Sequence, residues 1–197
     1  MKPAGIILAA GESSRMGRDK ALLRYGDSTF LNHLVSLFLP RVEPLIVVLG
    51  HHADEIAACL PPAQGVNVVV NRDYKRGMLT SLQAGLRSVP ATAPAVMFTL
   101  VDHPAVSEAT VDGLIEQFFR GGQALAIPRF GERRGHPVLL TRRVAEEILA
   151  LAPDSSAKDV IRGYRGETLF VDAGDPGVLQ DIDLPADYEN LVQQQRE

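Results

Sequence analysis

Two patterns of apolar residues alternate along the chain. In the first, apolar residues follow one another with at most one polar residue among them, which is typical of strands buried on both faces of a sheet. These runs cover residues 6–8, 45–49, 66–70 and 96–101. In the second, apolar residues recur every three or four positions, which predicts amphipathic helices. These segments cover residues 29–39, 54–60, 79–89 and 107–119, and Ser107 is placed to cap the last of them.

The same alternation continues to the end of the chain. We expect strands at 123–128 and 168–171, a turn that leads into a strand within 134–140, and helices at 142–150, at 156–164 and from 185. Buried strands joined by helices predict an α/β protein with a mostly parallel sheet that is covered on both faces. The chain shows no internal repeat or linker, so a single domain over residues 1–197 is expected.

Composition narrows the classes of partner. The chain has 197 residues, of which 46% are hydrophobic, and a net charge of −4 from 20 Lys+Arg and 24 Asp+Glu. This balance disfavours nucleic acid as a partner, although a local group of cations can still bind a small anion. No apolar run approaches the ~20 residues of a membrane span, and the N-terminal run is too short for a signal peptide.

The cysteine content points to a cellular compartment. Cys59 is the single cysteine and can form no intramolecular disulfide, which fits a reducing compartment. Its apolar neighbours predict that the thiol is packed inside the protein. We therefore expect a cytoplasmic protein.

A basic, glycine-rich loop follows the first predicted strand. Residues 8–20 read L-A-A-G-E-S-S-R-M-G-R-D-K. Gly11 and Gly17 let backbone N–H groups approach an anion, while Arg15 and Lys20 offer cationic partners for phosphate. The loop matches neither the Walker loop nor the dinucleotide fingerprint, and Arg15 breaks the G-x-S-x-G pattern of a nucleophile elbow. A solvated turn is the alternative, but the loop stands at the carboxyl end of a strand, where open α/β sheets bind ligands.

Carboxylates occur at two further places of interest. Asp102 follows the strand predicted at 96–101, and a carboxylate there suits Mg²⁺, which prefers hard oxygen ligands. Asp181 and Asp183 stand two positions apart in an extended segment, so their side chains can share a face. Helix and turn capping is the alternative role for Asp102 and Asp183. Together with the basic loop, these carboxylates describe a site for phosphates and a metal ion.

Five segments then occur in a shared order. They are the loop at 8–20, N-R-D-Y-K-R-G-M-L-T-S-L at 71–82, V-D-H-P at 101–104, G-H-P-V at 135–138 and D-I-D-L-P-A-D-Y at 181–188. The first resembles the signature L-A-A-G-x-S-x-R-M-G-x-x-K of the MobA-like nucleotidyltransferases. The others are similar to motifs of the branch that contains the molybdenum cofactor (molybdopterin) cytidylyltransferases. The resemblance covers nearly the whole chain and implies their three-layer α/β/α, Rossmann-like fold.

The resemblance implies roles for residues of a nucleotide-binding half, about residues 1–105. The base and ribose would be held by backbone contacts with Leu8, Ala9, Ala10 and Gly11. Arg15 and Lys20 would hold the triphosphate. Gly77 and Ser81 would line the nucleotide pocket. Asp102 would bind Mg²⁺, with Asp183 as the favoured second ligand and Asp181 as the weaker one.

An acceptor half, about residues 106–197, would carry His136, Asp154 and Lys158. A histidine beside a proline is otherwise more often a hydrogen-bonded structural residue. The segment 153–158 also departs from the G-D-x-G-A-R of that branch, because both glycines are lost and Lys158 replaces arginine, which is not equivalent at a bidentate phosphate site. Ser156 equally fits a plain helix start, so this segment is either part of the acceptor site or a cap.

The implied reaction transfers a nucleotidyl group from a nucleoside triphosphate to an acceptor phosphate and releases pyrophosphate. Mg²⁺, Arg15 and Lys20 would stabilise the charge on the leaving group, and an ionised phosphate needs no general base. Ala10 resembles the cytidylyl branch, whereas the guanylyl branch usually has glycine there, so CTP is favoured.

The favoured acceptor is the molybdenum-bound pterin cofactor, and a molybdoenzyme is a candidate partner. A sugar or polyol phosphate is the alternative acceptor. A non-catalytic carrier or sensor of a nucleotide or pterin is the alternative from another class. The missing dinucleotide fingerprint disfavours a nicotinamide-dependent oxidoreductase.

Overall fold

The computed structural model, which describes residues 1–61 and 64–195, is built around an eight-stranded sheet. In spatial order its strands are β10 (Thr168–Asp172), β7 (Leu125–Phe130), β9 (Val138–Thr141), β6 (Ala95–Leu100), β1 (Ala4–Ala9), β4 (Leu45–Leu49) and β5 (Val66–Val70), and the short β8 (Arg133–Arg134) pairs with β7. Strands β6, β1, β4 and β5 are mutually parallel, and β10 is parallel to β7, while β9 runs antiparallel between β6 and β7. The α/β fold with a mostly parallel sheet is therefore as predicted.

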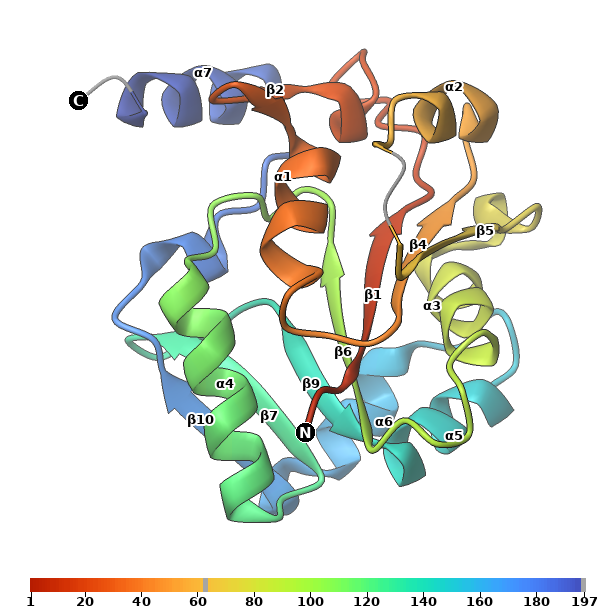
Figure 1. The fold of residues 1–197 in the computed structure, drawn as a ribbon, viewed down its shortest axis with the longest axis vertical. Helices are drawn as coiled ribbons and strands as arrows, with labels where there is room; N and C mark the ends of the chain where they lie inside the picture. The colour runs from red at the N-terminus through yellow and green to blue at the C-terminus, as the bar shows by residue number, and fades with distance from the viewer. Residues whose placement is uncertain (62–63, 196–197) are drawn as a thin grey trace.

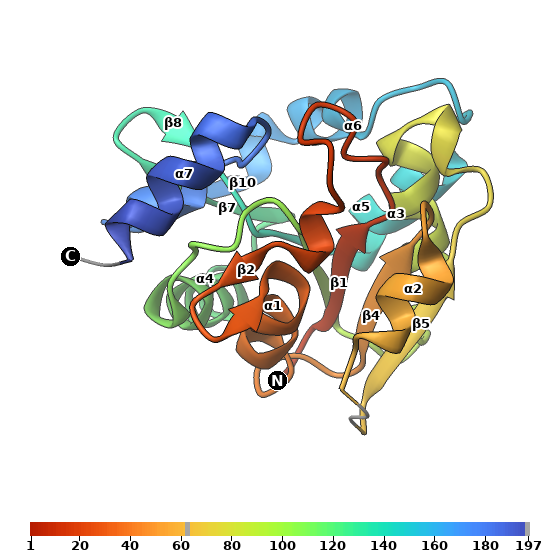
Figure 2. The same cartoon turned by 90° about the horizontal axis from the view of Figure 1, so that it is seen from above.

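Helices cover both faces of this sheet (Figures 1 and 2). They are α1 (Phe30–Phe38), α2 (Ala53–Ala58), α3 (Met78–Arg87), α4 (Glu108–Gly121), α5 (Arg142–Ala150), α6 (Ala157–Gly163) and α7 (Pro185–Gln194). Alternate residues of β1 divide between two buried clusters, as the two-residue period of a strand requires. Ile7 packs with the buried residues of α1 and α4, and Ile6 with those of α3 and α5.

The parallel register brings the ends of three strands to one edge of the sheet. Leu8 of β1 pairs with Leu100 of β6, and Ala9 pairs with Leu49 of β4. The loop that follows β1 and the segment that follows β6 therefore leave the sheet side by side. This edge is where the basic loop and Asp102 were predicted to meet.

The C-terminal helix packs against the small hairpin of β2 (Arg24–Tyr25) and β3 (Ser28–Thr29), as Figures 1 and 2 show. The Tyr188 hydroxyl donates a hydrogen bond to the Arg24 carbonyl at 3.1 Å, and its ring lies edge-on to Phe30 with centroids 5.9 Å apart. These contacts fix the segment before α7, which carries Asp181 and Asp183, above the carboxyl edge of the sheet.

The predicted elements are present, with shifts at their ends. The strand expected at 123–128 is Leu125–Phe130, because α4 continues to Gly121 and Gly122 then takes a left-handed turn (φ 71°) before the strand begins. The prediction of a packed Cys59 was wrong: α2 buries only Ile56, and Cys59 lies exposed just past its end. Among the described residues, no helix is both long and apolar enough to cross a membrane. The extent of the domain and its division into halves remain predictions.

Candidate functional site

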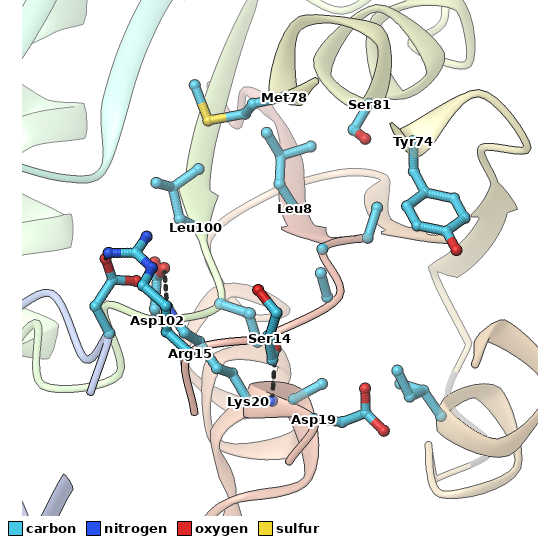
Figure 3. Close-up of a pocket in the computed structure, with 18 of the residues that line it drawn as sticks. Leu8, Ser14, Arg15, Asp19, Lys20, Tyr74, Met78, Ser81, Leu100 and Asp102 are labelled. Carbon is cyan, nitrogen blue, oxygen red and sulfur yellow. Dashed lines mark hydrogen bonds and ion pairs between the residues drawn. The ribbon is translucent and has the colours of Figure 1, made fainter. Parts of the chain in front are cut away.

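A cavity of about 380 Å³ lies at the carboxyl edge of β1 and β6. Every residue predicted to hold the nucleotide lines it, together with the two favoured metal ligands, namely Leu8, Ala9, Ala10, Gly11, Arg15, Lys20, Gly77, Ser81, Asp102 and Asp183. The weaker candidate ligand, Asp181, does not line it. Figure 3 shows Leu8, Met78, Ser81 and Tyr74 at one end, and Arg15, Lys20 and Asp102 at the other. The cavity thus has a mainly apolar end and a charged end. We call the whole cavity the nucleotide cavity, after the ligand that the sequence predicts there.

The loop between β1 and Lys20 is held by its own backbone. The Ser13 carbonyl accepts hydrogen bonds from the N–H groups of Met16 and Gly17 at 2.9 and 3.1 Å. Ser13 (φ 50°) and Gly17 (φ 70°) both adopt left-handed conformations, which glycine takes without steric cost. The Ser13 hydroxyl also accepts a hydrogen bond from the Lys20 N–H at 3.1 Å, so this turn fixes the position of the Lys20 backbone. Ser13 was not assigned a role from the sequence, although its conformation creates the turn.

Lys20 joins two carboxylates at the charged end. Its Nζ donates to Asp102 Oδ2 at 3.0 Å and to Asp183 Oδ1, and its side chain is only 10% exposed. The Arg15 guanidinium, 69% exposed, lies 2.6 Å from Asp183 Oδ2. Burial lowers the pKa of Lys20, but the charges of Asp102 and Asp183 outweigh it and raise that pKa. Lys20 therefore stays charged in this cluster.

Asp102 is held ionised by its neighbours. Burial raises the pKa of Asp102, but the hydrogen bond with His103 Nδ1 (3.1 Å) and the charge of Lys20 outweigh burial and lower the pKa to about 2. Burial and the charges of Asp102 and Asp183 raise the pKa of Asp181. The carboxylate of Asp102 is thus ionised near neutral pH.

Among the described residues, neither Asp102 nor Asp183 caps a helix or turn with its side chain. The start of α7 is capped by Asp187, whose Oδ2 accepts hydrogen bonds from the N–H groups of Asp183 and Leu184 at 3.1 and 2.7 Å. The side chain of Asp183 is consequently left to face Lys20. Asp102 directs its side chain to Lys20 and His103, while its carbonyl accepts a bond from the Ile182 N–H at 3.0 Å. That backbone bond holds Ile182 beside Asp102, so the next residue, Asp183, lies at the nucleotide cavity.

A second cavity, of about 420 Å³, adjoins the first. The two are neighbours because the consecutive residues Asp102 and His103 line one each. Its charged lining consists of Arg133, Arg134, Lys158, Arg162 and Asp181, with His103 and His136 beside them. The Arg134 guanidinium lies over the Phe170 ring, 4.5 Å from its centroid. Asp181 and Asp183 therefore face different cavities. This cationic pocket, which we call the second cavity, suits an anionic ligand.

The three predicted acceptor-side residues differ in their placement. His136 and Lys158 line the second cavity, whereas Asp154 lines neither cavity; its side chain is 87% exposed and lies 3.7 Å from Arg76. Ser156 caps α6 through the N–H of Lys158 at 3.2 Å. The segment 153–158 is therefore a helix cap that also contributes Lys158 to the cavity.

His136 is held neutral within the cavity wall. Its ring packs edge-on against His103 and Phe98, with centroids 4.8 and 5.7 Å away. Burial and the neighbouring His103 lower the pKa of His136 to about 3. Its Nδ1 is buried without a hydrogen-bond partner among the described residues.

Two groups of side chains in the described residues have donors close enough for a metal ion. Asp102, His103 and Asp181 form one, and Asp19, His51 and His52 the other. In addition, the carboxylates of Asp102 and Asp183 already converge on one cation, the ammonium of Lys20. Hard oxygen donors that meet at a cation position fit Mg²⁺ better than the imidazole-rich second group, which is typical of zinc.

Sequence comparison places this geometry among known proteins. Residues 5–169 match the MobA-like NTP transferase domain. The chain is 32% identical to a probable molybdenum cofactor guanylyltransferase of Mycolicibacterium paratuberculosis (94% of this chain, 87% of the relative) and 25% identical to the molybdenum cofactor cytidylyltransferase of Escherichia coli (93% and 92%). It is also 28% identical to the nicotine blue oxidoreductase of Paenarthrobacter nicotinovorans (95% of both chains).

Solved structures share the fold. A crystal structure of Rv0371c from Mycobacterium tuberculosis is 30% identical and superimposes with a TM-score of 0.83 over 98% of both chains. A complex of Rv0371c with manganese superimposes with a TM-score of 0.79 over 98% of this chain and 99% of the other, at 28% identity.

Proposed function

We propose, from the premise that the chain belongs to the MobA-like NTP transferase family of nucleotidyltransferases, that it transfers CMP from CTP to a phosphorylated acceptor. An oxygen of the acceptor phosphate forms a bond to the α-phosphorus, and the bond from the α-phosphorus to the bridging oxygen breaks. Pyrophosphate leaves with that electron pair. The observation that carries the proposal is the meeting of two cavities at Asp102 and His103, one suited to a nucleotide and the other cationic.

The nucleotide cavity would bind the triphosphate at its charged end. Lys20 and Arg15 there exchange their carboxylate partners for phosphate oxygens, which reduces the charge that accumulates on the leaving group. The backbone of residues 8–11, with Gly77 and Ser81, would hold ribose and base at the other end. The chain's work is positioning and charge neutralisation, since an ionised phosphate nucleophile needs no proton removed.

Asp102 and Asp183 would hold Mg²⁺. When bound, a divalent ion supplies Lewis-acid stabilisation of the phosphate oxygens. The charge of Asp102 supports this role, because its pKa of about 2 keeps the carboxylate ionised near neutral pH.

The second cavity would bind the acceptor. Its lining contains four cationic side chains and one carboxylate, which favours a ligand with several negative charges. The cations are Arg133, Arg134, Lys158 and Arg162, and the carboxylate is Asp181. We favour the molybdenum-bound pterin cofactor, because relatives that cover most of this chain are named for its cytidylyl or guanylyl transfer. A molybdoenzyme would then receive the product.

CTP is favoured over GTP because of Ala10, which lines the nucleotide cavity and resembles the cytidylyl branch. A sugar or polyol phosphate is the alternative acceptor, and it would occupy the second cavity while the nucleotide cavity keeps its role. A non-catalytic carrier would bind the same nucleotide without releasing pyrophosphate. Because one relative is named as an oxidoreductase, a control reaction with a nicotinamide cofactor tests this chain for redox activity.

The test is pyrophosphate release with each of the four nucleoside triphosphates, Mg²⁺, and either molybdenum-bound pterin cofactor or a polyol phosphate. We expect release with CTP and the pterin cofactor. Release with GTP instead would overturn the base assignment, and release only with the polyol phosphate would overturn the acceptor. Tight nucleotide binding without release from any acceptor would favour the carrier.

A further inference from the structure

A buried amide connects the end of β5 to the nucleotide cavity. Asn71 follows β5 directly and is only 7% exposed. Its side chain contacts Thr80 and Ser81 in the first turns of α3, and Ser81 lines the nucleotide cavity. Nothing in the proposed transfer reaction so far uses Asn71, although it begins one of the five shared segments.

The orientation of the Asn71 amide is determined by a backbone donor. The N–H of Asp73 can only donate, and it lies 3.0 Å from Asn71 Oδ1, so this atom is the carbonyl oxygen. The NH₂ group must then face the other way. Its nitrogen lies 3.0 Å from Thr80 Oγ1 and 3.0 Å from Ser81 Oγ, so both hydroxyl oxygens accept a hydrogen bond from Asn71.

The hydroxyl protons of Thr80 and Ser81 differ in whether the protein supplies an acceptor for them. The Thr80 hydroxyl donates to the carbonyls of Gly77 and Asp73, at 2.9 and 3.0 Å. Within the described parts of the chain, the Ser81 hydroxyl accepts from Asn71 and donates to no protein group. Because Ser81 lines the nucleotide cavity, its proton is left for a ligand there. A ligand acceptor would satisfy that proton, whereas a ligand donor would bond the second lone pair of Ser81 Oγ and leave the proton unpaired, so the hydroxyl favours an acceptor.

We propose that Asn71 is a positioning residue for base selection, and that it fixes the Ser81 hydroxyl as a donor to N3 of a cytosine base. N3 of cytosine is an acceptor, whereas N3 of uracil carries a hydrogen, so a hydroxyl held as a donor accepts cytosine and rejects uracil at this position. This inference rests on the proposed binding of CTP and adds the residue that sets the polarity of the contact.

Replacement of Asn71 by aspartate reverses that polarity while keeping the shape. A carboxylate still accepts the bond from the Asp73 N–H, but its second oxygen accepts the Ser81 proton instead of donating to Ser81. The lone pairs of Ser81 Oγ then face the base and favour the N3–H of uracil. The added negative charge weakens binding of every triphosphate by a similar factor, so the effect cancels in the ratio of two dissociation constants.

The experiment measures dissociation constants for CTP and UTP with Mg²⁺, without acceptor, for wild type and three variants. Asn71→Asp should shift the ratio of the two constants toward UTP by about tenfold, the usual worth of one such bond. Ser81→Ala should bring the ratio close to one. In the double variant, Asn71→Asp should no longer shift the ratio, because Asn71 acts through Ser81.

Thr80→Val is the matched control. It removes the hydroxyl that braces the same turn but leaves the Ser81 proton in place, so it should lower thermal stability without changing the ratio. An Asn71→Asp protein that keeps the wild-type preference, or one that shifts it in the Ser81→Ala background, would overturn the inference while leaving CMP transfer intact. A wild-type protein that binds neither pyrimidine nucleotide would overturn the proposed base and this inference together.

Discussion

The ammonium of Lys20 donates a hydrogen bond to the carboxylate of Asp102 across 3.0 Å, although 82 positions separate the two residues along the chain. They meet because β1 and β6 are adjacent parallel strands whose carboxyl ends lie at one edge of the sheet. Asp183 joins them through the backbone bond between Ile182 and Asp102. Three distant segments thus form one charged cluster, and each of its members can be tested separately.

The role of Lys20 predicts a loss of turnover. Lys20→Met should lower the rate of pyrophosphate release by about 10²–10³, because it removes a preorganised cation from the leaving group. Arg18→Met is the control, since Arg18 belongs to the same basic loop, is exposed and does not line the nucleotide cavity. Equal losses in the two variants would show that the loop contributes only general positive charge.

The two candidate metal ligands predict different metal requirements. Asp183→Asn should raise the Mg²⁺ concentration for half-maximal pyrophosphate release by at least about tenfold, because Asp183 shares a cation position with Asp102. Asp181→Asn should change it much less, since Asp181 faces the second cavity. A metal titration of both variants decides the question, and the opposite order would assign the second ligand to Asp181.

The cations of the second cavity predict an effect on the acceptor alone. Arg134→Gln and Arg162→Gln should each raise KM for the acceptor about tenfold, and leave the dissociation constant for CTP unchanged. Arg143→Gln is a matched control, because Arg143 also lies over an aromatic ring, that of Tyr164, but pairs with Glu167 and lines neither cavity. Weaker CTP binding in the first two variants would contradict the division of labour between the cavities.

The buried His136 predicts a pH dependence of stability. Its pKa is lowered to about 3 in the folded protein, whereas in the unfolded chain it lies near 6.5. Between these values only the unfolded chain binds the proton, so stability is complete above pH 6.5 and falls as the pH decreases. The loss from this residue between pH 6.5 and 5 is about 2 kcal/mol.

Urea unfolding at these two pH values measures that loss. A His136→Phe protein, whose ring can keep the contacts with Phe98 and His103, should lose correspondingly less stability over the same interval. His33, whose pKa burial also lowers, contributes with the same sign and remains in both proteins. An unchanged pH dependence in the variant would show that His136 does not stay neutral.

Two glycines predict stability changes of opposite sign. A Cβ at Gly135 would lie 1.9 Å from the carbonyl oxygen of Val178, which also accepts the His136 N–H, so Gly135→Ala should cost about 1–3 kcal/mol. A Cβ at Gly113, inside α4, would meet open space, so Gly113→Ala should add about 0.5–1 kcal/mol. Thermal unfolding compares the two, and a stable Gly135→Ala protein would mean that the wall of the second cavity yields easily.

Local pattern was sufficient for most elements of the fold. The apolar runs at 45–49 and 66–70 correspond to β4 and β5, and Ser107 caps α4 as its side-chain chemistry predicts. These features depend on neighbours a few residues away, so periodicity and capping chemistry report them. Cys59 shows the limit of such reasoning, because burial of a residue past a helix end depends on what packs there.

The sequence by itself determined the α/β class, the basic loop after β1 and the residues that line the nucleotide cavity, because these follow from local periodicity and a resemblance in shared motifs. Only the tertiary structure decided that Asp183 faces Lys20 while Asp187 caps α7, that Asp154 stands apart from both cavities, and that Asn71 directs its amide at Ser81. Each of these depends on contacts between segments far apart in the chain. Such contacts are chosen by strand order and packing, which no short stretch of sequence contains.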